Sequence, residues 1–508
     1  MEQPHKRSYR PARPAGVAMD GIMPARKPAR LVRMPKISAS RSHAAVPSLP
    51  PITMDLPGQA VASKRYKKTS KKRGFGWWAR HASLIFVAAA VLTTSLLFTK
   101  GYVKLHKVFK GGSTAVALQA HVDPSMLKGE GDGRINMLLL GKGGPGHDGP
   151  DLTDTMLLAS IDPVNNTMSL LSVPRDLWVT PASGASSKIN AVYANAKYRA
   201  LAKNPHDTAG AEAAGISAAE QAVSQVLGIP IQYYGMLDFT AFKQAVDAVG
   251  GVTINVPSDL IDPTMAWENN WNPVLARQGV QTFNGTQALL YVRSRHGSAR
   301  GDFDRTERQR LLITALTQKI LTAGTYTNPL KLSQLMSAFG DHTSTDMSTT
   351  DAGRLMTIMK RIGSSKVSSI GLADPPNNYV VTGSYAGQSV VEPVAGLENY
   401  AAIQSYVRNT LKDGYLIKEN ANITVLNGST NVSAATDEAA TLKSYGYTVG
   451  VVGDAPAHNY AKTTLVDLTK GQDPYTKHYL EQRLGVTATT KLPANIQPGS
   501  AQFVIIVG

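Results

Sequence analysis

The stretch INMLLLGKGGPGHDGPDLTDTMLLASIDPVNNTMSLLSVPRD, residues 135–176, decides the fold. It holds three short apolar runs, Ile135–Leu140, Met156–Ile161 and Met168–Val173, each bounded by turn residues. Short apolar runs with such boundaries are typical of buried strands. The residues between the second and third runs, Asp162–Asn166, favour a turn, so these two runs are predicted to form a hairpin.

Strands and helices alternate along the chain after this stretch. Thr208–Leu227 and Phe239–Val249 have the pattern of helices, and Ile231–Leu237 has that of a strand. The alternation predicts an α/β domain over residues 131–375, with α-β-α layers around a mixed central sheet. Within this domain, Asp259–Thr282 contains Pro, Asn and Trp and is expected to be a long irregular loop.

Two helical patterns, residues 329–339 and 350–362, are expected to complete this domain. Residues 376–418 are rich in turn residues and are predicted to be a connecting segment. Residues 419–508 follow the order β-α-β-β-α-β, which predicts a small α+β domain. This last domain contains no catalytic constellation, so a binding or scaffolding role is expected for it.

The N-terminal part of the chain is basic. Residues 1–81 hold 18 Lys and Arg against three acids, a net +15 of the chain's +17, whereas the remaining body is nearly neutral. Residues 1–78 lack a periodic apolar pattern and are predicted to be a disordered cytoplasmic tail. A nucleic-acid-binding arm is the alternative, but attraction to anionic lipids fits a tail beside a membrane better, and no nucleic acid partner is expected.

An uncharged and mostly apolar run, Ala82–Thr99, follows the tail. Its length suits one membrane-spanning helix, predicted over residues 79–100. The basic residues before it and the pair Trp77-Trp78 at its edge place the N-terminus in the cytoplasm. A cleaved signal peptide is disfavoured, because the run begins some 80 residues into the chain and no cleavage pattern follows. Residues 101–130 are then a juxtamembrane spacer, and the body is extracytoplasmic.

The chain has no cysteine, which excludes disulfides, thiol nucleophiles and thiolate metal sites. Charged residues instead gather at the expected ends of apolar elements. Arg305, Arg308 and Gln309 share a helical face with Leu312, which is the face that the helix buries. Arg293 and Arg295 share a face only if their segment is extended, and we interpret them as a converging pair.

Arginines beside carboxylates suit phosphate chemistry. A guanidinium binds phosphate oxygens through two N–H groups and keeps its charge, and carboxylates can hold Mg²⁺ (or Mn²⁺) that bridges phosphates. Phosphoryl transfer requires mainly positioning and charge neutralisation. The loop Gly141–Gly149 is neither a Walker A sequence nor a dinucleotide fingerprint, and zinc binding through His147 has little support. Acyl transfer has none, because no Ser-His-Asp order or GxSxG occurs.

Seven blocks, LLLG, LTDT, SLLSVPRD, KIN, VGGV, YVRSRH and GDFDRTERQR, occur in the order seen in the LytR–CpsA–Psr family, which the chain resembles over roughly residues 131–325. The C-terminal segment, from ITVLNGST to FVIIVG, resembles the LytR C-terminal domain. The resemblance implies a membrane-anchored extracytoplasmic phosphotransferase. It would move a glycopolymer from a polyprenyl pyrophosphate carrier onto peptidoglycan, with Mg²⁺ assisting and the lipid tail in an apolar pocket.

The resemblance also implies roles for single residues. Asp154 matches a metal-binding aspartate, and Asp176 would either orient an arginine or assist proton transfer. The residues implied to act on the pyrophosphate are Arg175 with Asp176 (the PRD pair), Arg293 and Arg295 (the RxR pair), and Arg305, Arg308 and Gln309 (the RxxRQ block).

This sequence departs from the family pattern in the glycine-rich loop. Lys142-Gly143-Gly144-Pro145 stands where an Asp and an Arg are usual, and Leu152-Thr153 stands where an Arg is usual. Asp148 or Asp151 could replace the metal carboxylate, and His147 or Lys142 part of the positive charge. Three alternatives therefore stay open: a polyprenyl-pyrophosphate phosphatase, a noncatalytic wall-binding or regulatory membrane protein, and a transcriptional regulator. The last conflicts with a body that lies outside the membrane.

Overall fold

The computed structural model describes residues 111, 115–182, 184–321, 340, 342–363 and 366–508, which all belong to one compact unit, residues 75–508. The predicted basic tail, the predicted membrane span and the predicted helix at 329–339 lie outside the described residues. Within the described ranges, no helix is long and apolar enough to cross a membrane.

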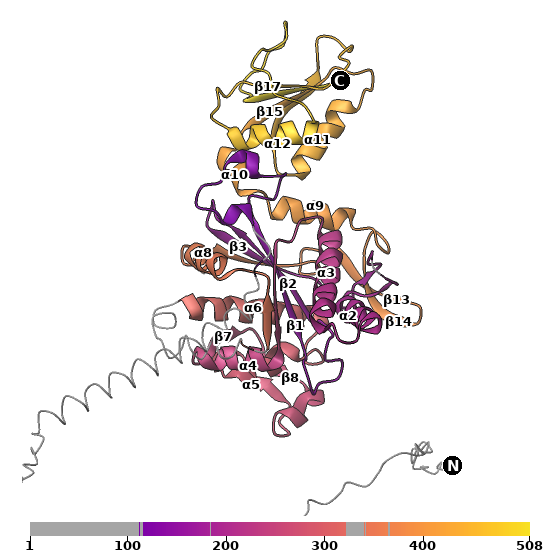
Figure 1. The fold of residues 1–508 in the computed structure, drawn as a ribbon, viewed down its shortest axis with the longest axis vertical. Coiled ribbons are helices and arrows are strands. Elements are labelled where there is room, and N and C mark those ends of the chain that lie inside the picture. Colours follow the sequence, from indigo (N-terminus) through magenta and orange to yellow (C-terminus); the bar gives the residue numbers. More distant parts are fainter. Residues whose placement is uncertain (1–110, 112–114, 183, 322–339, 341, 364–365) are drawn as a thin grey trace, which may run out of the picture. The chain divides into compact units, whose positions relative to one another are not determined.

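A six-stranded mixed sheet forms the centre of the larger domain (Figure 1), as the alternation predicted. Its order is β11-β6-β1-β2-β3-β12; β1 pairs antiparallel with β2 and parallel with β6, and β3 pairs parallel with β12. The three predicted apolar strands and the hairpin turn are confirmed, with Asp162 accepting from the backbone N–H of Val164 and Asn165. The strands are β1 (Ile135–Lys142), β2 (Thr155–Asp162), β3 (Thr167–Ser172), β6 (Tyr233–Asp238), β11 (Thr343–Thr345) and β12 (Val367–Gly371).

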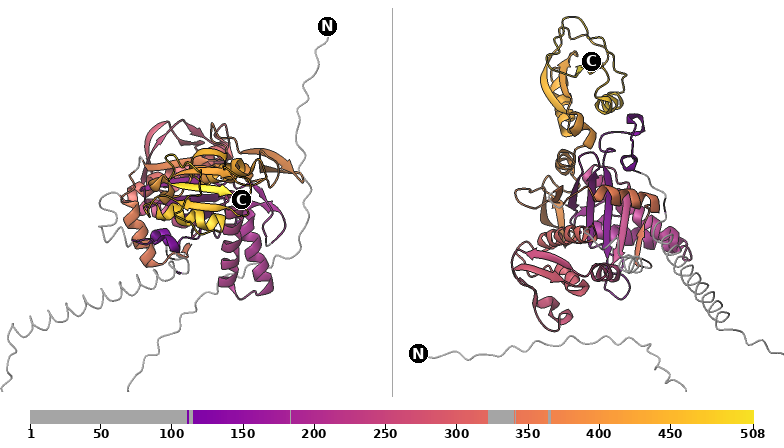
Figure 2. Two further views of the ribbon diagram at one scale, coloured as in Figure 1. Left: turned by 90° about the horizontal axis from the view of Figure 1, so that it is seen from above. Right: turned by 90° about the vertical axis from the view of Figure 1, so that its left-hand side faces the viewer.

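Alternate side chains of the central strands enter different cores. Leu138 and Leu140 of β1 pack with α2 and α3 on one face, whereas Met137 and Leu139 point to the opposite face, toward α6 and α8. The two faces give the predicted α-β-α layers (Figures 1 and 2), in which α2 and α3 lie side by side. The covering helices are α2 (Val192–Lys203), α3 (Thr208–Leu227), α6 (Asp302–Leu321), α8 (Thr349–Met359) and α9 (Ala401–Thr410).

Local capping sets where several of these helices begin. Asp207 accepts from the N–H of Gly210 at the start of α3, and Asp238 accepts from that of Ala241 at the start of α4 (Phe239–Ala248). α5 (Gly285–Arg293) begins with a capping box in which Asn284 and Gln287 exchange hydrogen bonds.

A second layer, made of short strands and a 3₁₀ helix, lies beside α4 and α5. It shows that one of our expectations was wrong. Asp259–Thr282 is not an irregular loop: it contains β8 (Leu260–Ile261), the 3₁₀ helix η4 (Pro263–Glu268), β9 (Val274–Ala276) and most of β10 (Gly279–Phe283). β7 (Val252–Val256) pairs with β10 rather than with the large sheet, and β8 pairs with β9. Short strands interrupted by turns lack the long alternation from which they can be predicted.

The turn-rich segment 376–418 also has more structure than expected. It contains the hairpin β13 (Val380–Tyr385) and β14 (Gln388–Pro393), in addition to α9 and α10 (Gly414–Glu419). Two further short strands, β4 (Trp178–Val179) and β5 (Ser187–Lys188), pair with each other. Before β1 lie two 3₁₀ turns, η1 (Val116–Leu118), which contributes the buried Leu118, and η2 (Pro124–Met126). The third 3₁₀ turn, η3 (Ile189–Ala191), leads into α2.

The C-terminal residues form a separate four-stranded sheet, ordered β16-β15-β18-β17, with two helices packed on it. The element order is the predicted β-α-β-β-α-β. The elements are β15 (Asn422–Asn427), α11 (Ala434–Ser444), β16 (Thr448–Asp454), β17 (Thr464–Asp467), α12 (Pro474–Leu484) and β18 (Phe503–Val507).

Candidate functional site

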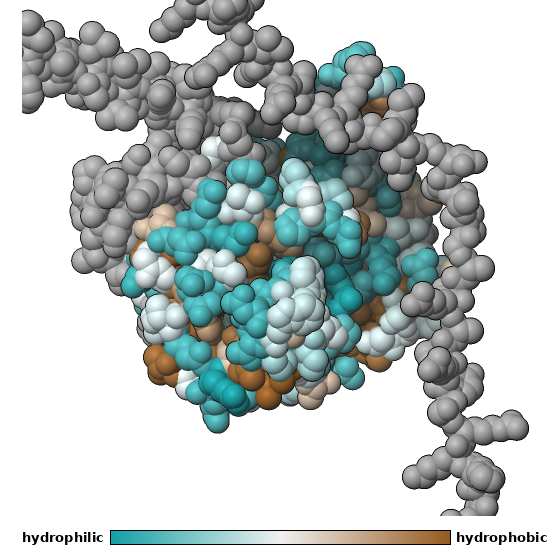
Figure 3. All heavy atoms as spheres, turned by 90° about the horizontal axis from the view of Figure 1, so that it is seen from below, coloured by the Kyte–Doolittle hydropathy of each residue, from teal (hydrophilic) through white to brown (hydrophobic). Residues whose placement is uncertain are grey.

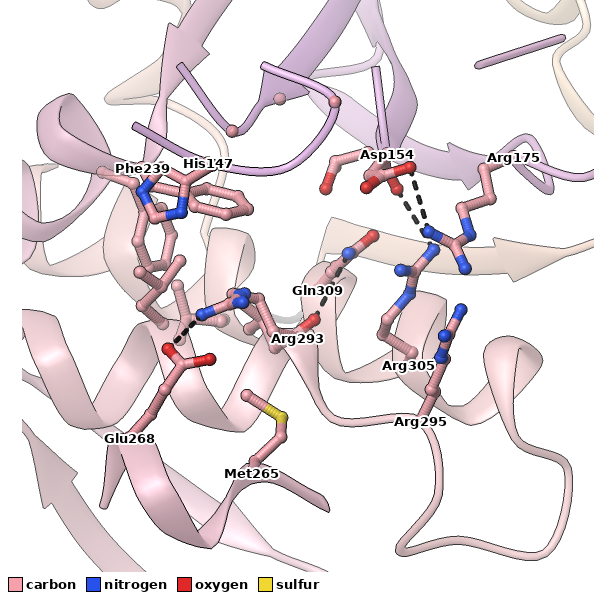
Figure 4. Close-up of a pocket in the computed structure, with 18 of the residues that line it drawn as sticks. His147, Asp154, Arg175, Phe239, Met265, Glu268, Arg293, Arg295, Arg305 and Gln309 are labelled. Carbon is pink, nitrogen blue, oxygen red and sulfur yellow. Dashed lines mark hydrogen bonds and ion pairs between the residues drawn. The ribbon is translucent and has the colours of Figure 1, made fainter. Parts of the chain in front are cut away.

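A cavity of about 780 Å³ opens where β1 and β2 meet α4, α5 and α6. Most of its wall is apolar, and one end is ionic (Figure 4). The apolar wall includes Leu139, Leu157, Leu237, Phe239, Phe242, Met265, Leu289, Val292, Leu312 and Ile313. The polar lining includes seven of the nine residues predicted for catalysis or metal binding, namely Asp148, Asp154, Arg175, Arg293, Arg295, Arg305 and Gln309.

Asp154 and two arginines make the ionic end. Asp154 Oδ1 accepts from Arg175 Nη1 at 3.0 Å, and the Asp154 backbone oxygen accepts from Arg305 Nη2 at 3.2 Å. Arg305 also contacts Asp302, with Nη2 to Oδ1 at 3.0 Å. Figure 4 shows both guanidinium groups on the same side of Asp154, with Arg295 approaching them from below. Residues from a loop, a strand end and two helix ends thus converge on one point.

Both of these arginines keep donors that the protein does not satisfy. Arg175 Nε and Arg305 Nε are buried and donate no hydrogen bond among the described residues, although Arg175 Nε lies 3.5 Å from a carboxylate oxygen of Asp176 and of Asp302. Burial lowers the pKa of Arg305, while at Arg175 the carboxylates of Asp154 and Asp302 outweigh burial and raise the pKa. Buried donors are normally paired, so the unpaired Nε of Arg305 beside a second arginine indicates an anion-binding position.

Arg293 faces a different part of the cavity from Arg295. α5 continues to Arg293, so the segment is not extended as the expected pair requires, and the two arginines lie apart along the cavity. Arg293 pairs with Glu268 and lies over the ring of Phe239, 5.0 Å from its centroid. His147 contacts the same ring edge-on, with the centroids 5.0 Å apart. Arg295 lies instead on the side of Arg175 and Arg305 (Figure 4).

Asp176 lies behind the site and does not line the cavity. Its Oδ1 accepts from Lys188 Nζ at 2.9 Å, and its Oδ2 lies 3.5 Å from Arg175 Nε. Of the two roles considered for this residue, this geometry supports orientation of Arg175. A carboxylate held by a lysine and turned toward an arginine is not placed to take a proton from a molecule in the cavity.

Arg308 does not line the cavity either, although it lies on the buried face as predicted. It donates to the backbone oxygens of Tyr291, at 3.0 Å, and of Ser294. It therefore fixes the end of α5, from which Arg293 projects. Gln309 does line the cavity, and its amide points to the oxygen of Val292 at 3.4 Å. Residues i, i+3 and i+4 share one helical face, but that face is wide enough to contact two different surfaces.

The glycine-rich loop that departs from the family pattern is held by contacts that lie outside the cavity. Lys142 Nζ lies 3.2 Å from Asp151 Oδ1 and 3.2 Å from the hydroxyl of Tyr193, and Lys197 also binds Asp151, at 2.9 Å. Burial works against ionisation of Asp151, but its hydrogen bond to Lys197 and the charge of Lys142 lower its pKa overall. Neither Lys142 nor Asp151 lines the cavity, so neither replaces the charges missing from the family pattern.

The residues that were candidates for Mg²⁺ fit the ion only in part. Asp148 is exposed, and Asp154 Oδ1 already accepts from Arg175 and from Asn190 Nδ2, at 3.0 Å each. In the part of the chain that the structure describes, no three His, Asp or Glu side chains are grouped to hold a metal. Asp154 Oδ2 could supply one oxygen ligand, and a Mg²⁺ here would need further oxygens from a substrate phosphate and water.

Asn190, Glu268 and Phe239 were not predicted as site residues. Asn190 belongs to the KIN block and holds Asp154, so its place in one of the blocks that carry the family resemblance was an available signal. Glu268 and Phe239 approach from η4 and the start of α4, and nothing local in the sequence indicates that these elements meet.

Residues 101–394 match the model of the LytR_cpsA_psr family, and residues 420–508 match the LytR cell envelope-related transcriptional attenuator model. Because the first match covers more than half of the chain, the protein belongs to the LytR–CpsA–Psr family.

Among named relatives, the chain is 28% identical over 234 residues to the polyisoprenyl-teichoic acid–peptidoglycan teichoic acid transferase TagV of Bacillus subtilis, covering 44% of this chain and 54% of that protein. It is 26% identical over 345 residues to the cell wall biosynthesis protein LcpA of Corynebacterium glutamicum, covering 63% of each. The chain thus spans between about half and two thirds of the length of these relatives. A crystal structure of B. subtilis TagV gives a TM-score of 0.41 at 25% identity, covering 55% of this chain and 96% of that one.

Proposed function

We propose that this protein is a membrane-anchored, extracytoplasmic phosphotransferase that moves a glycopolymer from a polyprenyl pyrophosphate carrier onto peptidoglycan. The observation that carries the proposal is the cavity, whose apolar body ends at Arg175 and Arg305, each with a buried Nε that donates no hydrogen bond. Such a cavity is complementary to a molecule with a hydrocarbon tail and an anionic head. The names of the relatives, which include a teichoic acid transferase, support the same class of donor and acceptor.

In this proposal, each region of the cavity holds one part of the donor. The apolar wall would hold the polyprenyl tail, and Arg175, Arg305 and Arg295 would bind the pyrophosphate. The acceptor hydroxyl attacks the phosphorus that carries the sugar, its proton passes to water, and the bond to the bridging oxygen breaks. Polyprenyl monophosphate leaves, and a phosphodiester joins the glycopolymer to the acceptor. Fixed cations stabilise the charge that builds on the leaving oxygen.

Other residues position these groups. Asp176 and Asp302 orient Arg175, and Arg308 fixes the end of α5, whose last residue, Arg293, is held by Glu268. Asp154 would contribute one oxygen to Mg²⁺, which neutralises phosphate charge when bound. Dependence on Mg²⁺ is part of the proposal.

The test uses the full chain in vesicles with a polyprenyl-pyrophosphate oligosaccharide and a peptidoglycan acceptor, with and without Mg²⁺. Mass spectrometry follows lipid monophosphate and the coupled product. A metal-dependent phosphodiester product is the expected result. Hydrolysis without coupling would replace this proposal with the phosphatase. Binding of donor without turnover would favour the noncatalytic wall-binding protein, an outcome to which the changed loop at residues 142–153 gives some physical basis.

A further inference from the structure

Two exposed tryptophans lie on one short insertion beside the cavity, residues 260–276. Trp267 is 65% exposed and lines the cavity, and Trp271, four residues further along, is 81% exposed. The third tryptophan among the described residues, Trp178, is only 8% exposed. Large aromatic rings are costly to leave in water, so two such rings on one insertion mark an interaction surface.

The backbone of the insertion that carries these rings is fixed by local contacts. Residues 260–276 begin and end in the β8–β9 pair, and η4 carries Trp267. The Trp271 backbone N–H donates to Ala266 at 2.8 Å, and both Asn270 and Trp271 have positive φ angles, 52° and 62°. Non-glycine residues seldom adopt this conformation, so a tight turn that presents Trp271 outward is specifically maintained.

The charges of the insertion decide which partner it fits. Arg277 pairs with Asp259, Asp262 accepts from Thr264 and Ser294, and Glu268 pairs with Arg293. Each charged side chain of residues 259–283 therefore has a partner within the protein. The face drawn in Figure 3 likewise mixes hydrophobic, intermediate and hydrophilic residues. An anionic polymer would need unpaired cations, whereas an uncharged interface with exposed Trp is typical of contact with lipid headgroups.

The bilayer is also within reach of the described body. The apolar run that we expect to cross the membrane ends at Thr99, and the continuous description of the chain begins at Ala115. The 15 residues between them span at most about 50 Å. This length allows the described body to contact the membrane surface, from which a polyprenyl carrier must leave.

We propose that residues 260–276 dock the cavity mouth on the outer surface of the membrane, with Trp267 and Trp271 in the headgroup layer of the bilayer. This contact would let the lipid tail pass from the bilayer into the cavity without crossing water. The identity of the lipid substrate in this inference rests on the proposed function. Docking itself can be measured without any turnover of that substrate.

The experiment uses the full chain with Trp77→Phe and Trp78→Phe, reconstituted in phosphatidylcholine vesicles with normal or brominated acyl chains. Bromine quenches indole emission on contact, and buried Trp178 provides an unquenched reference. We expect lower indole emission in brominated vesicles than in normal ones. Trp271→Ser should reduce this loss of emission. Salt at 1 M should leave it unchanged, because salt screens charge pairs only. Equal emission in both vesicles, or a quench that salt removes, would overturn the proposal. So would a dimer in detergent that Trp271→Ser dissociates, which would assign the surface to a second copy.

Turnover separates this proposal from the function on which it rests. Trp271→Ser is expected to lower transfer from a membrane-embedded donor about tenfold, the effect of losing part of one aromatic ring's burial. Transfer from a short-chain, water-soluble donor should be unchanged. Val432→Ser, which alters a residue 92% exposed in the C-terminal domain, is the matched control. Turnover without quenching would refute docking alone, and quenching without turnover on either donor would refute the proposed function alone.

Discussion

Replacement of Arg305 tests whether the ionic end binds a pyrophosphate. The Arg305 side chain is 5% exposed, its Nη2 is held by Asp302 and the backbone of Asp154, and its Nε is free to donate. One or two charge-assisted hydrogen bonds to a phosphate are worth about 3 kcal/mol together, which corresponds to roughly 100-fold in affinity. Arg305→Met should therefore raise the Kd for inorganic pyrophosphate about 100-fold.

The assay is thermal unfolding of the full chain with pyrophosphate at 100 times the wild-type Kd. A ligand at that concentration stabilises the folded state by about 2.7 kcal/mol. For a domain of this size the midpoint should rise by about 5–10 °C. At the same concentration the variant gains only about 0.4 kcal/mol, or roughly 1 °C.

Two further variants complete this test. Arg305→Lys keeps the charge but loses the planar fork, so an intermediate midpoint shift is expected, and it answers the question if the Met variant fails to fold. Arg277→Met removes an exposed arginine outside the cavity and should leave the pyrophosphate shift unchanged. A folded Arg305→Met protein with the full shift would show that this arginine does not bind the anion and that the reasoning from its free N–H is wrong.

Three other predictions follow from single contacts. Burial, with a smaller effect from a neighbouring carboxylate, raises the pKa of Glu220 from 4.5 to about 7, so ionisation of Glu220 destabilises the folded state as pH rises from about 4.5 to 7. Glu220→Gln should therefore stabilise the protein by about 1–2 kcal/mol above pH 7, after a discount for partial exposure, and should not change its stability below pH 4.5. Denaturant titrations at both pH values measure this difference. Asp151→Asn should speed hydrogen exchange in residues 143–150, because it weakens the lysine contacts that hold the loop; unchanged exchange would mean that the glycine turns alone fix it. Asp154→Asn should cut Mg²⁺-dependent transfer by about 100-fold, whereas Asp148→Asn, at an exposed position, should change it by less than about threefold; equal losses in initial rate would place the metal on both carboxylates.

Local patterns were sufficient where a residue's neighbours lie close in sequence. The apolar runs of β1 and β2 and the turn at Asp162 predicted the centre of the sheet, and the stripe of Arg305, Gln309 and Leu312 predicted the buried face of α6. The alternation of side chains along β1 was a signal that we did not use. Lys142 is two residues from Leu140 and four from Leu138, so it extends the face that packs on α2 and α3, away from the cavity.

Other features depend on pairing between distant segments. η4 brings Glu268 to Arg293, and the end of α5 separates Arg293 from Arg295, but neither arrangement follows from spacing alone. Arg310 shows the same limit. It lies on α6 beside the predicted stripe, yet it is 1% exposed because both sides of that helix are covered, and it binds Asp374 and Ser172.

The ionic end also explains how arginines can converge without a bound anion. Arg175 and Arg305 are balanced by Asp154 and Asp302, and the charge of Asp176 is balanced by Lys188. A buried charge without a partner would be strongly destabilising, so these carboxylates are required in the unliganded protein. A pyrophosphate then competes with Asp302 for the same guanidinium groups, and its binding energy is the difference between the two sets of contacts. The Nε of Arg305 makes that difference favourable, because it gains a hydrogen-bond partner without losing one.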